Sequence, residues 1–114
     1  MTINEKRNHP RISALNLISY TCIDETDKIV AQGMGRTLNI SEDGILLETH
    51  VAIDPRYSIA LAIGLEDELI NLKGSVIHST SGKNEKFEAG IEFVETDDTT
   101  IDVLKKYIHA FSEQ

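Results

Sequence analysis

Two short groups of side chains in this 114-residue chain have the types and spacing to bind a small anion. Arg7 and Arg11 lie four residues apart. In an extended segment, residues at even offsets point to the same side, so both guanidinium groups can face one ligand. Arginine suits phosphate through paired hydrogen bonds and flat rings through stacking. Taken alone, the same spacing also fits an ordinary solvated basic segment.

The second group is formed by Asn39, Ser41 and Gly44, in the order Asn-Ile-Ser-Glu-Asp-Gly. Short Asn and Ser side chains can hydrogen-bond either the local backbone or the edge of a ligand. Gly44 allows a conformation or a close approach that a Cβ atom would block. Considered by themselves, these residues are explained better by a simple β-turn than by a binding site.

The elements that must position these groups are mostly strands. Alternating apolar and polar side chains, β-branched residues and turn signals predict six strand-like runs. The runs span residues 12–23, 28–40, 45–49, 57–65, 69–80 and 87–93. Gly33 and Gly35 interrupt the second run, which predicts a bulge or bend there.

The last segment changes to a helical period. Its apolar positions recur at spacings of three, four and three, and they are Ile101, Leu104, Ile108 and Phe111. This spacing predicts a helix over residues 98–112. Thr99 and Asp102 resemble a capping box at its start. The order of elements predicts a mainly-β fold, a small barrel with the helix packed on its end or against a second subunit.

Length and composition favour one domain over residues 1–114, because two domains would each be near the lower limit for an independent core. Within it we expect an N-terminal arm at residues 1–11, the barrel at 12–95 and the helix at 98–112. The single cysteine, Cys22, excludes an internal disulfide and fits a reducing cytosol. No signal peptide and no membrane-spanning run of apolar residues is expected.

The charge of the chain is acidic but unevenly distributed. Eleven Lys and Arg residues face nineteen Asp and Glu residues, which gives a net charge of −8. This balance argues against general binding to DNA, RNA or anionic membranes. Lys6, Arg7, His9 and Arg11 nevertheless form a small cationic segment. Because salt screens exposed charges beyond about 10 Å, such a segment can attract a small anion locally.

The remaining candidates for chemistry are weak. The four histidines are scattered and have no partnering thiolates, so we expect no metal site. Cys22 lies in a strand-like run without an adjacent base, which favours a buried structural thiol over a nucleophile. We therefore expect no catalysis.

Taken together, and separated by about thirty residues, the two groups resemble the signatures of the PilZ domain family. Arg7 and Arg11 match its N-terminal R-x-x-x-R, and Asn39, Ser41 and Gly44 match its D/N-x-S-x-x-G. A further match, Gly90-Ile91-Glu92-Phe93, is similar to the family's late G-x-x-F strand. The resemblance covers roughly residues 5–93, and the terminal helix is in keeping with it.

The resemblance implies a six-stranded antiparallel β-barrel with a C-terminal α-helix that binds the bacterial second messenger cyclic di-GMP without catalysis. Arg7 and Arg11 would clamp guanine and phosphate, which agrees with the preference of Arg for the O6 and N7 edge of guanine. Asn39, Ser41 and Gly44 would form the opposing edge of the site.

Three further positions are candidates for secondary contacts. Lys6 stands where many relatives have another Arg or an apolar residue, so the number of nucleotides bound stays open. Arg36 could contact phosphate or be a solvated strand-end residue. Gly90 belongs to the late strand match. After Gly74-Ser75-Val76 the family often has a basic residue, but here Ile77 and His78 follow.

The resemblance also implies a receptor that signals to a partner protein in the bacterial cytoplasm. We expect the arm to be mobile without ligand and to dock beside residues 39–44 when cyclic di-GMP binds. The nucleotide is the ligand, and no other cofactor is expected. The chain could be a monomer or a homodimer.

Two other functions compete with this interpretation. The first is an adaptor with the same fold that binds protein and no nucleotide. The second is a barrel that binds single-stranded nucleic acid. The latter needs a basic groove with stacking aromatic residues, and a net charge of −8 with six Phe and Tyr residues and no Trp does not meet this need.

Overall fold

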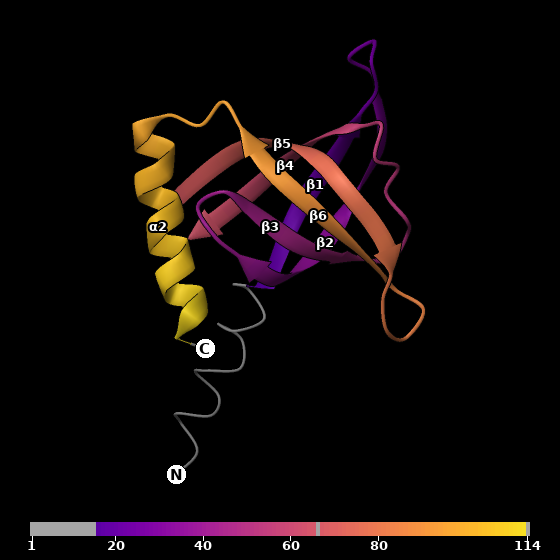
Figure 1. The fold of residues 1–114 in the computed structure, drawn as a ribbon. Helices are drawn as coiled ribbons and strands as arrows, with labels where there is room; N and C mark the ends of the chain where they lie inside the picture. Colours follow the sequence, from indigo (N-terminus) through magenta and orange to yellow (C-terminus); the bar gives the residue numbers. More distant parts are fainter. Residues whose placement is uncertain (1–15, 66, 114) are drawn as a thin grey trace.

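The structure, a computed structural model, describes residues 16–65 and 67–113. Its strands are β1 (Leu17–Ile23), β2 (Ile29–Ile40), β3 (Gly44–Thr49), β4 (Ser58–Leu65), β5 (Glu68–Ser81) and β6 (Phe87–Val94), and its helix is α2 (Asp98–Ser112). Figure 1 shows the strands wrapped into a barrel with α2 beside it. The predicted six-stranded barrel with a C-terminal helix is thereby confirmed.

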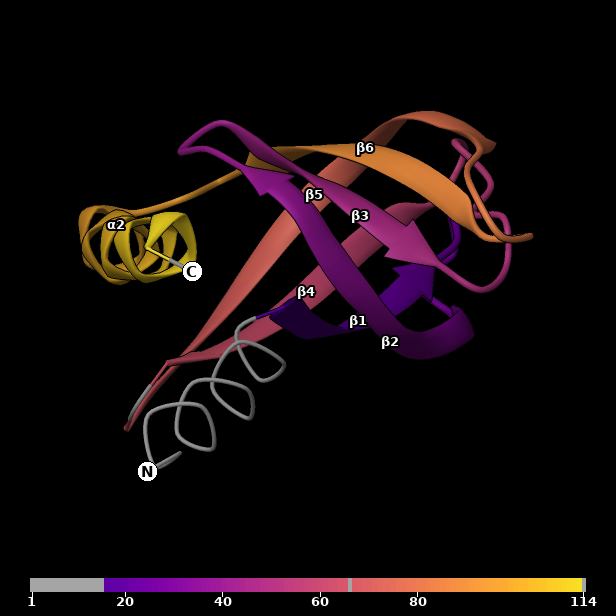
Figure 2. The same cartoon turned by 90° about the horizontal axis from the view of Figure 1, so that it is seen from below.

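The barrel closes through antiparallel pairs in the order β1-β2-β3-β6-β5-β4, and β4 pairs again with β1. Four of these pairs join strands that are consecutive in the chain. The pair of β3 with β6 is not local, and it brings the turn before β3 next to the end of β6. Figure 2 shows β3 and β6 side by side on one wall of the barrel.

The core is built mainly by alternation along the strands, which is interrupted where the pairing register shifts. In β5, Ile70, Leu72 and Val76 are buried, whereas Asn71 and Lys73 are exposed. This period of two places one set of side chains inside the barrel and the other in solvent. Among the largest fully buried side chains are Ile18, Leu47, Leu61, Leu72, Ile91, Leu104 and Tyr107.

Helix α2 packs its apolar face against one end of the barrel, the first of the two predicted alternatives (Figures 1 and 2). Val103, Leu104 and Tyr107 are buried there. The Tyr107 hydroxyl lies 3.1 Å from Oγ1 of Thr37 in β2, and both residues are buried. Burial raises the pKa of the Tyr107 hydroxyl. At the surface, Lys106 Nζ forms an ion pair with Glu68 Oε2 at 3.1 Å.

The predicted capping box of α2 was wrong. The N-cap is Asp97, whose Oδ1 accepts a hydrogen bond of 2.7 Å from the backbone N–H of Thr100. The helix begins at Asp98, one residue before Thr99, so Thr99 already belongs to the first turn. The hydrogen bond from Thr100 holds the pKa of the Asp97 carboxyl below its usual value.

Of the bulge or bend predicted at Gly33 and Gly35, the bulge is not present. Gly33 pairs regularly with Tyr20, and Gly35 with Ile18. A Cβ at Gly35 would lie 2.7 Å from Cγ of Leu47, and one at Gly33 would lie 2.8 Å from the Tyr20 hydroxyl. These glycines therefore make room for core side chains. The irregularities of the sheet lie elsewhere, and two of them border the candidate site.

The predicted arm, with Lys6, Arg7 and Arg11, lies outside the described residues, as does the stretch 12–15 of the first predicted strand. In the part of the chain that the structure describes, no helix is long and apolar enough to cross a membrane. The same part contains no group of three or more His, Cys, Asp or Glu side chains arranged to hold a metal ion.

Candidate functional site

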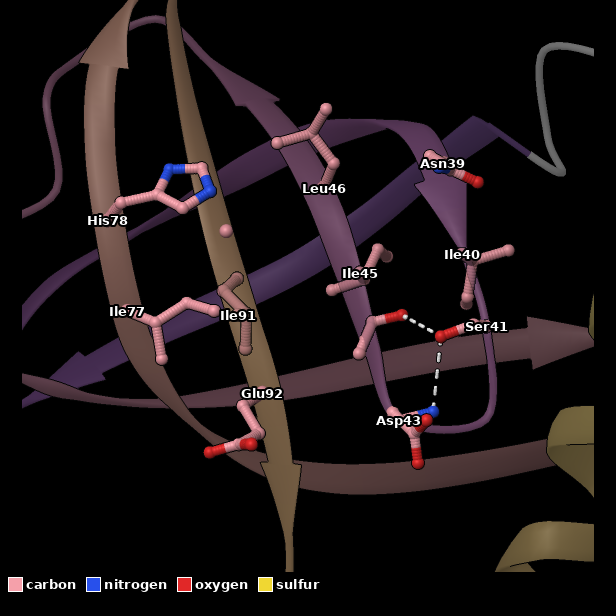
Figure 3. Close-up of a pocket in the computed structure, with 12 residues that line it drawn as sticks. Asn39, Ile40, Ser41, Asp43, Ile45, Leu46, Ile77, His78, Ile91 and Glu92 are labelled. Carbon is pink, nitrogen blue, oxygen red and sulfur yellow. Dashed lines mark hydrogen bonds between the residues drawn. The ribbon is translucent and has the colours of Figure 1, made fainter.

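A groove of about 420 Å³ lies on the outer wall of the barrel, across β3, β6 and β5 and beside the turn between β2 and β3. Figure 3 shows its lining side chains. Asn39, Ser41, Gly44 and Gly90, four of the positions predicted from the sequence, all line this groove. The fold thus brings together residues that are up to 51 positions apart in the chain.

A bulge in β2 turns Asn39 toward the groove. Thr37 pairs with Leu47 and Asn39 with Leu46, so Leu38 is an extra residue without its own partner. The alternation shifts at this point, and Thr37 and Ile40 are buried while Asn39 is exposed. Without the extra residue, Asn39 would share the inward parity of Thr37.

The turn that follows is fixed by its own backbone and by the Ser41 hydroxyl. The N–H of Ser41 donates to the carbonyl oxygen of Gly44 at 2.9 Å. The N–H of Asp43 donates to Ser41 Oγ at 3.2 Å. The N–H of Phe93 donates to the carbonyl oxygen of Asp43 at 2.9 Å, which ties the turn to β6. Figure 3 shows the Ser41 hydroxyl at the centre of this turn.

Gly44 is required by close packing between β3 and β6. A Cβ atom at this position would collide with the backbone carbonyl oxygen of Ile91. Gly44 and Glu92 are paired across the two strands, so the backbones meet there without an intervening side chain. The glycine of the second sequence group therefore allows β3 and β6 to approach each other closely at this end of the groove.

A second bulge shapes the opposite wall. Val76 pairs with Ile91 and His78 with Gly90, so Ile77 is the extra residue in β5. Ile77 and His78 are both exposed and both line the groove. Gly90 lies between Leu46 on one side and His78 on the other. The imidazole of His78 covers Gly90, with Cδ2 at 2.7 Å from where a Cβ would stand.

Leu46, Ile77 and His78 are groove residues that the sequence did not single out as site residues. In a regular strand His78 would share the inward parity of Val76, and only the bulge turns it outward. The basic residue that relatives often carry near this point was the one available hint, and the substitution by Ile77 and His78 obscured it.

The described lining of the groove is acidic. Asp43 and Glu92 contribute carboxylates, and none of the described lining residues is Lys or Arg. Arg36, a predicted secondary contact, is not among them. Its Nε instead lies 3.2 Å from Oε1 of Glu48, its cross-strand partner in β3. Lys86 Nζ lies 3.8 Å from the same oxygen.

Comparison with known proteins gives one family. A model of the PilZ domain matches residues 5–110. No curated protein matches the chain in sequence. The fold is similar to that of the PilZ domain of CeSA from a cellulose-synthesizing bacterium, with a TM-score of 0.58 and 10% identity over 84% of this chain and 93% of that one.

It is also similar to the PilZ domain of YcgR from Escherichia coli, solved with c-di-GMP, with a TM-score of 0.61 and 13% identity over 85% and 82% of the two chains. A tetrameric PilZ protein from Xanthomonas campestris gives a TM-score of 0.53 and 21% identity, over 76% of this chain and 48% of that one. These likenesses establish the fold, and the family match extends over both sequence groups. The chain belongs to the PilZ domain family.

Proposed function

We propose that this PilZ domain is a receptor for cyclic di-GMP and that the nucleotide binds in the groove between the β2–β3 turn and β5. The observation that carries the proposal is that Asn39, Ser41 and Gly44 line one groove with Gly90. The family match over residues 5–110 supports it, because it includes Arg7 and Arg11. The structure of YcgR with c-di-GMP shows a relative of the same fold together with this nucleotide.

The groove offers part of what such a ligand needs. Cyclic di-GMP carries two phosphate charges and two guanines. Asn39 can donate and accept hydrogen bonds at a base edge, and Leu46 and Ile77 provide apolar surface for a ring. No described lining residue supplies the positive charge that two phosphates require. In this proposal Arg7 and Arg11 supply that charge, and Lys6 adds to it.

The length of the chain allows the arginines to reach the groove. Leu17 begins β1 and pairs with Arg36, which lies three residues before Asn39. Leu17 lies six positions after Arg11. A fully extended segment of this length spans at most about 20 Å. Arg11 can therefore approach Asn39 without any rearrangement of the barrel.

Binding then changes the molecular surface. Residues 1–11 dock beside the β2–β3 turn and order against the nucleotide, at a cost of about 1–2 kcal/mol for each residue fixed. Hydrogen bonds from the guanidinium groups offset this cost. We infer that the resulting surface is read by a partner protein in the bacterial cytoplasm, and that the domain itself performs no catalysis.

Isothermal titration calorimetry with cyclic di-GMP, in competition with GMP and GTP, tests the proposal. We expect Arg7→Ala and Arg11→Ala each to abolish measurable binding, because each removes a charged, bidentate donor. Arg56→Ala is a matched control, since it removes the same charge from an exposed side chain that pairs with Asp54 away from the groove. Unfolding free energies of the arm variants should change by less than about 0.5 kcal/mol.

Two results would contradict the proposal. Wild-type affinity in either arm variant would remove the arginines from the site. An absence of heat with wild-type protein well above micromolar concentration would instead favour an adaptor that binds protein alone. The carboxylates of Asp43 and Glu92 in the groove are the observation that favours this second function.

A further inference from the structure

Glu92 occupies an open position in the groove. It is an outward residue of β6, it is exposed, and it lines the groove. Its two cross-strand neighbours are small, Gly44 in β3 and Ser75 in β5. Neither neighbour has a side chain that could cover the carboxylate. A flat group that lies beside Glu92, over one of these small neighbours, can therefore turn one of its edges toward the carboxylate.

The negative charge of Glu92 is not balanced by a described basic side chain. Within residues 16–65 and 67–113, Glu92 and Asp43 take part in no ion pair. Figure 3 shows both at the same end of the groove, whereas Asn39, Leu46 and His78 lie at the other end. Because like charges repel, phosphates are disfavoured at the acidic end relative to the other end of the groove. A ligand part with N–H donors can lie there.

We propose that Glu92 is the residue that makes the groove specific for guanine, an inference that rests on the proposed binding of cyclic di-GMP. Guanine presents two adjacent donors on its Watson–Crick edge, N1–H and the N2 amino group. An ionised carboxylate has two acceptor oxygens and no donor, so it accepts from both. Adenine presents an unprotonated N1 and a C2–H there, and its N1 lone pair would face the carboxylate.

This arrangement also fixes the orientation of the ligand. The Watson–Crick edge of one guanine lies against Glu92, and the phosphates point away from Asp43 and Glu92 toward the end of the groove at Asn39 and His78 (Figure 3). The negative groove and the dianionic ligand are then compatible, because the carboxylate meets base donors and the arginines meet phosphates.

Titrations of wild-type protein and Glu92→Gln with three cyclic dinucleotides test this inference. The probes are cyclic di-GMP, its inosine analogue, which lacks the N2 amino group, and cyclic di-AMP. For wild-type protein we expect the inosine analogue to bind at least about tenfold more weakly than cyclic di-GMP, since a charged hydrogen bond is lost. Cyclic di-AMP should bind more weakly still.

The variant Glu92→Gln distinguishes guanine recognition from simple electrostatic repulsion, because the two predict opposite changes in the affinity for cyclic di-GMP. If Glu92 reads guanine, the glutamine variant binds cyclic di-GMP about tenfold or more weakly than wild-type protein does, and the preference over the inosine analogue shrinks. If Glu92 only repels the ligand, removal of its charge tightens binding. Glu95→Gln is the control, because Glu95 is exposed, does not line the groove and gives the same change in charge.

The outcomes are distinguishable from those of the proposed function. Unchanged or tighter binding of cyclic di-GMP by Glu92→Gln, with wild-type protein binding normally, overturns the role of Glu92 alone. Equal binding of cyclic di-GMP and the inosine analogue by wild-type protein does the same. Wild-type protein that binds none of the three overturns the receptor function, and the role of Glu92 falls with it.

Discussion

At the scale of single residues, two glycines of the groove have different physical reasons to be glycine. A Cβ at Gly44 would meet a backbone carbonyl oxygen, that of Ile91, which belongs to the paired strand and cannot move independently. A Cβ at Gly90 would meet the ring of His78, the end of an exposed side chain that can rotate away. The first glycine allows the two strands to pack, and the second leaves space for the imidazole.

This difference predicts opposite results for two alanine substitutions. Gly44→Ala should lower the free energy of unfolding by about 1–3 kcal/mol, because β3 and β6 must separate to admit the methyl group. Gly90→Ala should change stability by less than about 1 kcal/mol, because only His78 moves. It should nevertheless weaken cyclic di-GMP binding, since the displaced ring enters the groove. Urea denaturation and calorimetry measure the two effects.

Gly64→Ala provides the control for this pair. The nearest atom to a Cβ there is Cδ1 of Leu69 at 4.0 Å, an ordinary contact, so the methyl group fits. We expect unchanged or slightly higher stability, because alanine restricts the unfolded chain. A Gly44→Ala protein as stable as Gly64→Ala would show that the strands tolerate the added atom and that Gly44 is not fixed by packing.

At the scale of elements, the helix is joined to the barrel wall close to the groove. Thr37 in β2 forms a hydrogen bond with the hydroxyl of Tyr107 in α2. Only the bulge residue Leu38 separates Thr37 from Asn39 of the groove. Removal of one partner leaves a buried hydroxyl without this hydrogen bond. We expect Tyr107→Phe and Thr37→Val each to cost about 1–2 kcal/mol of unfolding free energy.

The double variant decides whether the two hydroxyls act together. If the two hydroxyls stabilise each other, the double variant should lose less than the sum of the two single losses, because the contact between them can be lost only once. Chemical denaturation of the wild-type protein, the two single variants and the double variant completes this double-mutant cycle. Strictly additive losses would mean that the 3.1 Å contact contributes nothing to the attachment of α2.

Elements were more predictable than the details that shape the site. The run at residues 57–65 and the helix at 98–112 are nearly those observed, because regular alternation and a regular helical period are written directly in the sequence. Bulges are not. Leu38 and Ile77 are apolar residues inside strand-like runs, and nothing in their type shows that each lacks a cross-strand partner. The glycines that suggested a bulge, Gly33 and Gly35, serve core packing instead.

The site was predictable in the same uneven way. Asn39, Ser41 and Gly44 are close in sequence, so a single turn keeps them together whatever the fold. His78 and Glu92 reach them only because β3 pairs with β6 and β6 with β5. Such long-range register depends on which strands pair when the barrel closes, and the local patterns of a single sequence do not reveal this pairing. The predicted roles of Lys6, Arg7 and Arg11 stay predictions, since these residues lie outside the described part.

At the scale of the whole molecule, charge is divided between two regions. Residues 1–36 carry five basic and four acidic side chains, whereas residues 37–114 carry six and fifteen. The groove belongs to the acidic region, and its described lining has only carboxylates as charged groups. In the proposed function, the cationic segment at residues 6–11 and the barrel would bind the dianionic nucleotide together, so that the nucleotide connects the two regions.

Hydrogen–deuterium exchange tests this link. We expect amides of residues 1–11 to exchange more slowly with cyclic di-GMP than without it, because the segment becomes ordered on the groove. The same nucleotide should leave exchange in Arg11→Ala unchanged, whereas Arg56→Ala should behave like wild-type protein. Equal protection of residues 1–11 in the free and bound wild-type protein would show that the segment does not dock.

The staggered pairing of the barrel restricts where an extended peptide could add to the sheet. Between Leu17 and Val94, every strand lies between two hydrogen-bonded neighbours. The ladders are staggered, however, so that residues 29–35 of β2 pair with β1 alone and residues 76–81 of β5 pair with β6 alone. An extended peptide that added to the barrel through backbone hydrogen bonds would therefore find room beside these two stretches, and not where both neighbouring strands are already paired.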